Sequence, residues 1–250
     1  MIKNIEKNRY EKRFRALHDD KTFRKAFGSS YLNPTYREPY IVFEKIIMES
    51  ITKDHTVLEI GSGDGAYTYC LLKTGAIITA TDIAPSSLRI IRNQFQDQFP
   101  HSLKTHIADM IKLPFKDSSY DVVVSAGSLS YGENKLVLKE MKRVLKKDGF
   151  LILVDSLNHN IIYRFNRFIQ FLIGKRSWMT IKNMPDKNTV SLIQNIFRDV
   201  KVSFFGSITW ISPLITPIIG YKRVSKIICD FDRKLNVKYS AFKIVIKAKK

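Results

Sequence analysis

The chain has 250 residues, of which 44% are hydrophobic and 26% are charged. This composition excludes a disordered tail or a fibre, because it supplies enough apolar side chains for a packed core, and the length suits one large domain. The two cysteines are too few for a disulfide framework or a cysteine-based zinc site. The net charge of +19 predicts an anionic partner, such as nucleic acid, a phosphorylated substrate or a membrane surface.

The N-terminal segment, residues 1–54, is rich in charge and has no apolar stretch after its first basic residues, unlike a secretory signal. Apolar residues within 40–50 follow one helical face and predict a helix. The longest apolar run, 208–220, contains two prolines and is too short and too broken to span a bilayer. We therefore expect a cytoplasmic protein, and peripheral contact with the inner face of a membrane stays open.

Residues 55–156 alternate short β-rich runs with helical segments. This alternation predicts βαβ units and a parallel sheet with helices on both faces, an α/β Rossmann-like fold. The rest of the chain, 157–250, is more irregular and aromatic, with a helix expected at 189–197 and closing strands at 200–205 and 239–247. We expect strands at 56–60, 77–81, 120–126 and 150–155, a further strand that ends at 106–108, and helices at 66–73, 85–98 and 133–146.

A glycine-rich loop, GSGDG, follows the first predicted strand and precedes a helix. Glycines at this junction allow positive φ angles and close approach of a ligand to the backbone. The helix that follows offers free N–H donors. Because Gly61, Gly63 and Ala66 also satisfy the dinucleotide pattern G-x-G-x-x-G/A, a nicotinamide cofactor stays open at this point.

Three acidic residues lie at the carboxyl ends of the first three predicted strands, where ligands bind to such sheets. Glu59 suits a ligand with an ammonium group and a sulfonium, whereas a pyrophosphate would gain nothing from it. Asp82 can accept hydrogen bonds from both hydroxyls of a ribose. Asp109 can accept from the exocyclic amine of adenine while Met110 packs on the ring. In the alternative interpretation, Glu59 only caps its own turn and Asp109 is a solvated loop residue.

Four runs in order, VLEIGSGDG, ATDIAPSSL, ADMIKLPFKDSSYDVVVS and LKEMKRVLKKDGFLILVD, resemble the class I S-adenosylmethionine-dependent methyltransferases. The resemblance covers 55–156 and implies a seven-stranded sheet whose last strand is antiparallel. It also implies S-adenosyl-L-methionine as cofactor, S-adenosyl-L-homocysteine as product, and no metal. Ser125 would lie beside the reactive methyl. By position, the cofactor-binding residues in the core would be Glu59, Gly61, Ser62, Gly63, Gly65, Asp82, Ile83, Asp109, Met110 and Ser125.

The segment after the fifth predicted core strand is the best candidate for acceptor chemistry. His159 has an ordinary pKa of about 6.5 and would take a proton from a hydroxyl at neutral pH, with Asp155 orienting it. In the alternative, His159 only caps the next helix together with Asn158. Tyr131 and Tyr163 are weaker candidates for positioning a hydroxyl.

Two absences count against nucleic acid as the acceptor. The Asn/Asp-Pro-Pro-aromatic sequence typical of enzymes that methylate base amines is missing, because Ser-Ala-Gly-Ser stands after the fourth strand. Enzymes that methylate a pyrimidine carbon use a cysteine nucleophile at a strand end facing the crevice, and neither cysteine of this chain lies there. The basic residues also gather outside the core, since 1–25 carry nine Lys or Arg against four acids and 221–250 carry ten against two.

The C-terminal runs SLNHNIIYRFNRFIQFLIGKRS, FFGSITWISP and YSAFKIVIK resemble methyltransferases of bacterial surface-polysaccharide biosynthesis. That resemblance implies methylation of a sugar hydroxyl on a lipid-linked or nucleotide-linked intermediate. We expect 157–250 to form an acceptor-binding lid. Within it, Trp210–Gly220 is either a buried loop under the sheet edge, which we favour, or a segment at a membrane interface.

The N-terminal segment is expected, by analogy, to close over the cofactor, with Tyr31 or Arg37 meeting its carboxylate. The leading hypothesis is therefore a single-domain O-methyltransferase, residues 1–250, that acts on a glycan or another small hydroxylated acceptor. The alternatives are an RNA methyltransferase, a non-catalytic scaffold with a methyltransferase-like fold, and an NAD-dependent enzyme.

Overall fold

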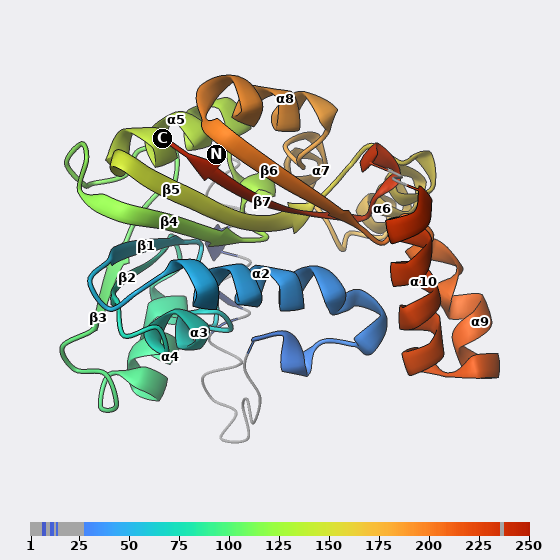
Figure 1. Ribbon diagram of the computed structural model, residues 1–250, viewed down its shortest axis with the longest axis horizontal. Helices are drawn as coiled ribbons and strands as arrows, with labels where there is room; N and C mark the ends of the chain where they lie inside the picture. Colours follow the sequence, from blue (N-terminus) through green and yellow to red (C-terminus); the bar gives the residue numbers. More distant parts are fainter. Residues whose placement is uncertain (1–6, 9–10, 13, 15–27, 236–237) are drawn as a thin grey trace.

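The computed structural model describes residues 7–8, 11–12, 14, 28–235 and 238–250. Seven strands form one sheet in the order β3-β2-β1-β4-β5-β7-β6 (Figure 1). The strands are β1 (Thr56–Ile60), β2 (Ile77–Asp82), β3 (Leu103–Ile107), β4 (Tyr120–Ala126), β5 (Leu145–Ser156), β6 (Arg198–Phe205) and β7 (Lys243–Lys249).

Only β7 runs antiparallel to its neighbours in the sheet, pairing with β5 on one side and β6 on the other. The chain order reverses between β1 and β4, which pair in parallel. Such a switch point opens a crevice at the carboxyl ends of the strands. The predicted Rossmann-like sheet with an antiparallel last strand is confirmed.

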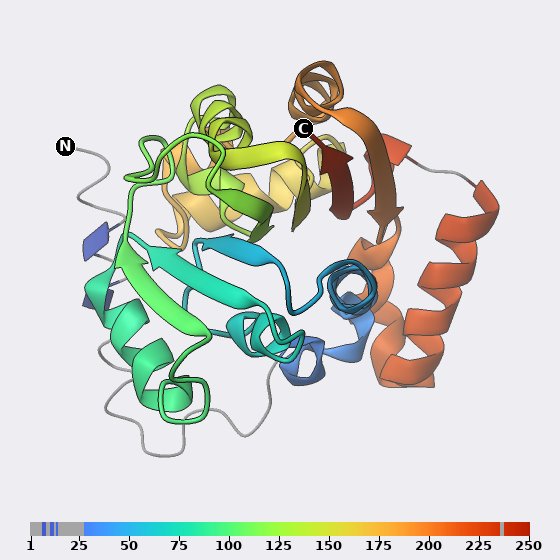
Figure 2. The ribbon, with the colours of Figure 1, turned by 60° about the vertical axis from the view of Figure 1, so that its left-hand side comes forward.

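Helices cover both faces of the sheet (Figure 1). α2 (Glu38–Ser50), α3 (Thr68–Leu72) and α4 (Pro85–Phe95) pack on one face, and α5 (Asn134–Val144) and α8 (Lys187–Ile196) on the other. Figure 2 shows α4 alongside β3 at the sheet edge. Because β-strand side chains alternate between faces, Leu58 joins the core under α5 while its neighbour Val57 joins the core under α2.

Helix ends follow local chemistry where the chain supplies it. Pro85 occupies the first turn of α4, where its missing N–H costs no hydrogen bond. Asp186 begins α8 with a capping box, since its carboxylate accepts from the N–H of Thr189 at 2.9 Å. The remaining short 3₁₀ helices are η1 (Gly28–Tyr31), η2 (Pro34–Tyr36), η3 (Leu129–Tyr131), η4 (Thr209–Ile211) and η5 (Lys238–Ser240).

The C-terminal region contains more helix than the sequence predicts: α6 (Ile161–Leu172), α7 (Trp178–Lys182), α9 (Ser212–Ile219) and α10 (Tyr221–Leu235). The interpretation of Trp210–Gly220 as a buried loop is wrong. That segment forms η4 and α9, and the side chains of Leu214 and Ile218 are 72% and 80% exposed. None of the helices in the described part of the chain has the length and apolar character needed to cross a membrane.

Candidate active site

A cavity of about 740 Å³ lies at the carboxyl ends of the central strands, at the switch point of the sheet. One part of its wall comes from the loops after β1 to β4, and the opposite part from η3, the start of α5, and α7. Its lining includes Gly61, Gly63, Asp64, Asp82, Ile83, Asp109, Met110, Ser128, Tyr131, Glu133, Leu136, Met179, Lys182 and Asn183.

The glycine loop after β1 forms the floor of this cavity. Gly61 has a φ of +70°, and a Cβ atom there would lie 2.6 Å from the Cβ of Ser128. Gly63 has a φ of +55°, and its N–H donates to the Asp82 carboxylate at 2.9 Å. Side chains other than glycine rarely adopt such φ angles, so the loop needs glycine at both positions. The backbone thus lies open to a ligand.

Asp82, at the end of β2, lines the cavity as predicted. One carboxylate oxygen accepts from Gly63 N and the other from Ala84 N, both at 2.9 Å. Burial raises the pKa of this carboxyl, and the hydrogen bonds oppose the rise. Each oxygen keeps a second lone pair, so the group can also accept hydrogen bonds from a ligand.

Glu59, inside the end of β1, is buried and does not line the cavity. Its carboxylate accepts from the Thr68 hydroxyl at 2.6 Å, at the start of α3. Burial raises its pKa to about 8, the Thr68 hydrogen bond opposes the rise, and the charges of Asp82 and Asp64 add to it. The predicted ligand contact is therefore replaced by a contact that ties the glycine loop to α3.

The charge of this cradle fits S-adenosylmethionine better than a dinucleotide. Glu59 and Asp82 both have a raised pKa, and Asp64 adds a third carboxyl that lines the cavity. A ligand with an ammonium group and a sulfonium would be attracted to the carboxylates that line the cavity, Asp64 and Asp82, whereas a pyrophosphate would be repelled by them.

Replacing Glu59 by Gln should make folding stability less sensitive to pH between 4.5 and about 8. The folded state binds the Glu59 proton more tightly than the unfolded chain does, because its pKa is raised from 4.5 to about 8. Stability therefore falls as pH rises through this window. We expect the melting temperature of Glu59→Gln to exceed that of the wild type by several degrees at pH 8 and to match it near pH 5, measured by calorimetry. A constant difference across this range would contradict the assignment.

The loop between β3 and β4 brings Asp109, Met110 and Ile111 to the cavity. Part of the Asp109 carboxylate shapes the loop itself, accepting from the N–H of Ile111 at 3.1 Å. The predicted placement of Asp109 and Met110 in the crevice is confirmed. A role of both residues toward adenine stays a prediction.

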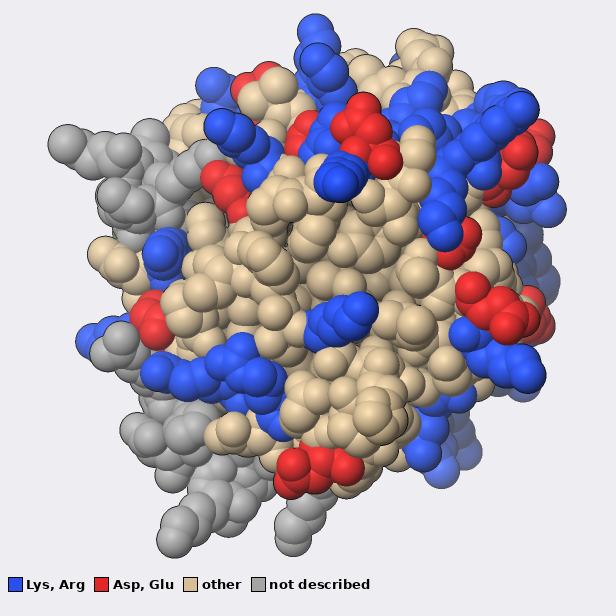
Figure 3. Space-filling view, turned by 90° about the vertical axis from the view of Figure 1, so that its left-hand side faces the viewer, with Lys and Arg blue, Asp and Glu red and all other residues tan. Residues whose placement is uncertain are grey.

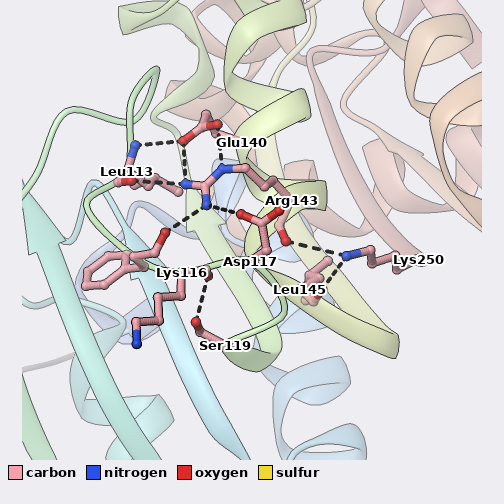
Figure 4. Close-up of polar contacts among 9 residues, drawn as sticks. Leu113, Lys116, Asp117, Ser119, Glu140, Arg143, Leu145 and Lys250 are labelled. Atoms are coloured by element: carbon pink, nitrogen blue, oxygen red, sulfur yellow. Dashed lines mark hydrogen bonds and ion pairs between the residues drawn. The ribbon is translucent and has the colours of Figure 1, made fainter.

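Arg143 of α5 holds this loop in place (Figure 4). Its guanidinium donates to the carbonyl oxygens of Phe115 at 2.7 Å and Leu113 at 3.0 Å. Glu140 accepts from Arg143 and from the N–H of Leu113, at 2.8 Å each. The bond to Arg143, more than any other contact, lowers the pKa of Glu140, so the pair stays ionised at neutral pH.

Three predicted cofactor contacts lie beneath the cavity instead of in it. Ser62 is buried and donates to the carbonyl oxygen of Thr81, from its N–H at 2.9 Å and from its hydroxyl at 3.2 Å. Gly65 packs against α4, where an added Cβ would lie 2.9 Å from the Phe95 ring. Ser125 is buried and hydrogen-bonds Ser128, which does line the cavity. These residues support the cradle.

Two described residues of the N-terminal segment line the cavity, but they are not the predicted ones. Lys7 and Phe14 line it, and Glu11 accepts from the Ser86 hydroxyl at 2.9 Å. The prediction for Arg37 is wrong, because its guanidinium donates to the carbonyl oxygens of Ser30 and Leu32, at 3.0 and 2.7 Å. The side chain of Tyr31 lies outside what the structure describes. No sequence pattern marks Lys7 or Phe14.

His159 does not reach the cavity, which corrects the predicted general base. After β5, Leu157 N donates to Phe242 O and Asn158 N to Pro185 O, and these bonds lead the chain away from the crevice. His159 is exposed and packs on Tyr239, with ring centroids 5.6 Å apart. The helix cap is Asn160, whose side chain accepts from Ile162 N, so the alternative cap by His159 is also wrong.

Asp155 does not orient His159 either. Its buried carboxylate accepts from the N–H groups of Leu129 at 3.0 Å and Ser156 at 2.6 Å. Burial raises its pKa, and the charge of Lys243 is the largest effect in the opposite direction. Asp155 therefore fixes η3, which carries Tyr131 into the cavity.

Replacing His159 by Ala should leave cofactor affinity, turnover and the pH profile within twofold of the wild type, because the ring packs on Tyr239 outside the cavity. Steady-state kinetics across pH 5–9 test this. A changed pH profile in His159→Ala would show that His159 takes part in catalysis.

The acceptor side of the cavity comes from residues that sequence reasoning largely missed. Of the two tyrosines proposed, Tyr131 lines the cavity, whereas Tyr163 is buried with its hydroxyl on Gly206 O. α7 contacts η3, and Asn134 at the start of α5 donates to the carbonyl of Asn183, just after α7, at 2.8 Å, so these segments form one wall. The residues of this wall come from segments that lie far apart in the sequence, so no local sequence pattern predicts them.

Charged residues show no single stripe on the face in Figure 3, where Lys and Arg stand singly or in small groups among Asp and Glu. Within the described ranges, no group of three or more His, Cys, Asp or Glu side chains is placed to hold a metal ion.

Comparisons with known proteins agree with this arrangement. Residues 58–153 match the family described as Methyltransferase domain. The chain is 31% identical over 182 residues to an uncharacterized protein of Methanocaldococcus jannaschii, covering 70% of this chain and 73% of that protein.

A sterol 4-C-methyltransferase of Caenorhabditis elegans is 36% identical over 105 residues, 41% of this chain. The chain spans only 31% of that enzyme's length. Geranyl diphosphate C-methyltransferase from Streptomyces coelicolor, solved with Mg²⁺, geranyl diphosphate and S-adenosyl-L-homocysteine, superposes with a TM-score of 0.63 at 11% identity, covering 96% of this chain and 97% of that one.

Proposed function

Because the chain belongs to the class I S-adenosylmethionine-dependent methyltransferases, we propose that it transfers a methyl group to a hydroxyl of a small amphipathic acceptor, such as a lipid-linked sugar. S-adenosylmethionine is its cofactor. We propose that Gly61, Gly63 and Asp82, which line the cavity, hold it.

The observation that carries the proposal is the mixed lining of the cavity beyond the glycine loop. Leu136 and Met179 supply apolar surface, while Glu133, Lys182 and Asn183 supply polar groups. Small-molecule sites combine mostly apolar walls with a few polar groups that fix orientation. An acceptor with an apolar part and a hydroxylated part would match both the apolar surface and the polar groups of the cavity.

Methyl transfer to a hydroxyl requires that the acceptor be aligned with the methyl group and that the hydroxyl proton be taken up. Bound S-adenosylmethionine would supply an electrophilic methyl group for the acceptor oxygen and would be left as S-adenosyl-L-homocysteine. The hydroxyl proton passes to Glu133, a carboxylate on the cavity wall, while Tyr131 on the same wall positions the hydroxyl.

Carbon methylation of an apolar acceptor is the second candidate. It is favoured by the relatives, one named a sterol 4-C-methyltransferase and one a geranyl diphosphate C-methyltransferase. The apolar residues of the cavity, with Met110 and Ile111 added, suit such acceptors as well.

Methyl-labelled S-adenosylmethionine, incubated with the full chain and separate lipid, nucleotide-sugar and RNA extracts, tests the acceptor class. We expect label in the lipid or nucleotide-sugar fraction, with an NMR shift of methyl bound to oxygen. Methyl bound to carbon would favour the second candidate, and label in RNA would overturn both. Transfer of label to any fraction excludes a non-catalytic scaffold.

The variant Glu133→Gln tests whether Glu133 takes up the proton or contributes to cofactor binding. We expect kcat to fall at least ~tenfold while the Kd of the cofactor is unchanged. Glu49→Gln, an exposed glutamate of α2, is the matched control. Unchanged kcat in Glu133→Gln would remove this residue from the mechanism.

A further inference from the structure

Helix α6 presents one face to the protein and fixes which face points outward. On the inner face, Tyr163 and Arg167 are 6% and 4% exposed. Arg167 donates to Leu157 O at 2.7 Å and to the Asn158 side chain at 2.9 Å. The Tyr163 hydroxyl accepts from Trp210 N at 3.2 Å. These bonds prevent the helix from turning to bury its other side.

The outward face of α6 and the start of α7 is apolar. Ile161, Phe165 and Leu172 are 79%, 66% and 65% exposed. A surface helix normally places polar residues there, and large contiguous apolar patches mark interaction sites. We define the α6 face as Ile161, Phe165, Phe168, Ile169, Leu172, Ile173 and Trp178.

The α6 face continues by aromatic contacts onto the helix that walls the cavity. Phe171 lies 6.2 Å from Phe168 and 5.7 Å from Trp178, between ring centroids. Trp178 begins α7 and is 54% exposed, whereas the next residue, Met179, lines the cavity. The α6 face is therefore adjacent to the acceptor wall.

The chain that forms α6 and α7 carries charge of one sign. Residues 156–185 contain no Asp or Glu, while Arg164, Lys175, Arg176 and Lys182 lie along the same stretch. A second exposed apolar helix, α9, lies at the same end of the molecule (Figure 1). The surrounding residues 200–229 also contain no acid, and they include Lys222, Arg223 and Lys226.

We propose that the α6 face docks on the surface of an anionic lipid bilayer. Phe, Leu, Ile and Trp side chains insert at the boundary between headgroups and acyl chains, and basic side chains next to them attract anionic lipid. Docking there would bring α7, and with it the acceptor wall, next to the lipid. The passage of an apolar acceptor by this route rests on the proposed function, whereas docking itself does not.

Co-sedimentation with vesicles tests docking without cofactor or acceptor. We expect the full chain to sediment with vesicles of phosphatidylcholine and phosphatidylglycerol, and much less with phosphatidylcholine alone. The double variant Phe165→Ser/Leu172→Ser should lose at least ~tenfold in binding. Met48→Ser, 52% exposed on α2, is the matched control and should bind as the wild type. Melting temperatures verify that the variants are folded.

Three results would overturn the proposal. One is equal binding to both vesicle types, because the basic residues would then have no part. Another is unchanged binding of the double variant. The third is a stable dimer without vesicle binding, dissociated by the double variant in ultracentrifugation, because the α6 face would then pair two copies. Methyl transfer to a soluble acceptor by the double variant, measured in parallel, reports on the proposed function separately.

Discussion

Asp82→Ala should weaken S-adenosylmethionine binding by at least ~100-fold, because hydrogen bonds to a charged group contribute about 1.5–3 kcal/mol each and the variant removes the carboxylate that can accept two. The loss has a second source within the protein. Asp82 also accepts from Gly63 N and Ala84 N, so the variant leaves two N–H groups of the cradle without a partner. Isothermal titration calorimetry measures the effect.

A graded series separates ligand contact from loop support. Asp82→Asn keeps one acceptor oxygen and should bind more weakly than the wild type but more tightly than Asp82→Ala. Asp97→Ala, which removes an exposed carboxylate just beyond α4, is the matched control and should bind normally. Wild-type affinity in a folded Asp82→Ala protein would remove this residue from the cofactor site.

Gly61→Val should abolish detectable cofactor binding and lower stability. The residue has a φ of +70°, and its Cβ would lie 2.6 Å from the Cβ of Ser128, closer than two such atoms can approach. Either Ser128 or the loop must move, and both line the cavity. We expect a loss of about 2–4 kcal/mol in the free energy of unfolding, from backbone strain and overpacking together. Urea unfolding and calorimetry check the two effects.

Gly174→Ala is the matched control for the backbone strain. Its φ is also +70°, but no atom lies within 4 Å of the position of a Cβ. It follows α6, away from the cavity, so it should cost about 1 kcal/mol and leave cofactor affinity unchanged. If Gly61→Val binds the cofactor as tightly as Gly174→Ala does, the close contact with Ser128 does not shape the site.

The sequence predicts the sheet well where each strand is buried on both faces. The strand β4 is predicted with its observed bounds, because a run such as Val122–Val124 has no polar face to confuse it. By contrast, the sequence predicts only where β3 ends, at 106–108, whereas the strand extends from Leu103 to Ile107. Within this strand Leu103 alone is buried, and Lys104, His106 and Ile107 are exposed at the sheet edge, so its apolar signal is weak.

The cofactor side of the site can be predicted from the sequence, because its residues follow the strands in a fixed order. The predicted residues that line the cavity are Gly61, Gly63, Asp82, Ile83, Asp109 and Met110. The acceptor side of the site cannot be predicted from the sequence in this way. His159 follows a strand too, but β5 pairs with β7, and the chain after Ser156 continues beside Phe242 instead of turning over the crevice. The path of the chain after β5 therefore depends on β7, a strand about ninety residues later, and no local sequence pattern predicts this pairing.

The place of β7 in the sheet has a consequence for how the chain reaches its fold. β7 lies between β5 and β6, both of which the ribosome delivers earlier. Until residues 243–249 emerge, β5 is an open edge and β6 has no strand to pair with. Such edges invite pairing with other chains during synthesis. Slow translation of residues 243–249, or loss of these residues, should therefore favour aggregation over a partly active intermediate.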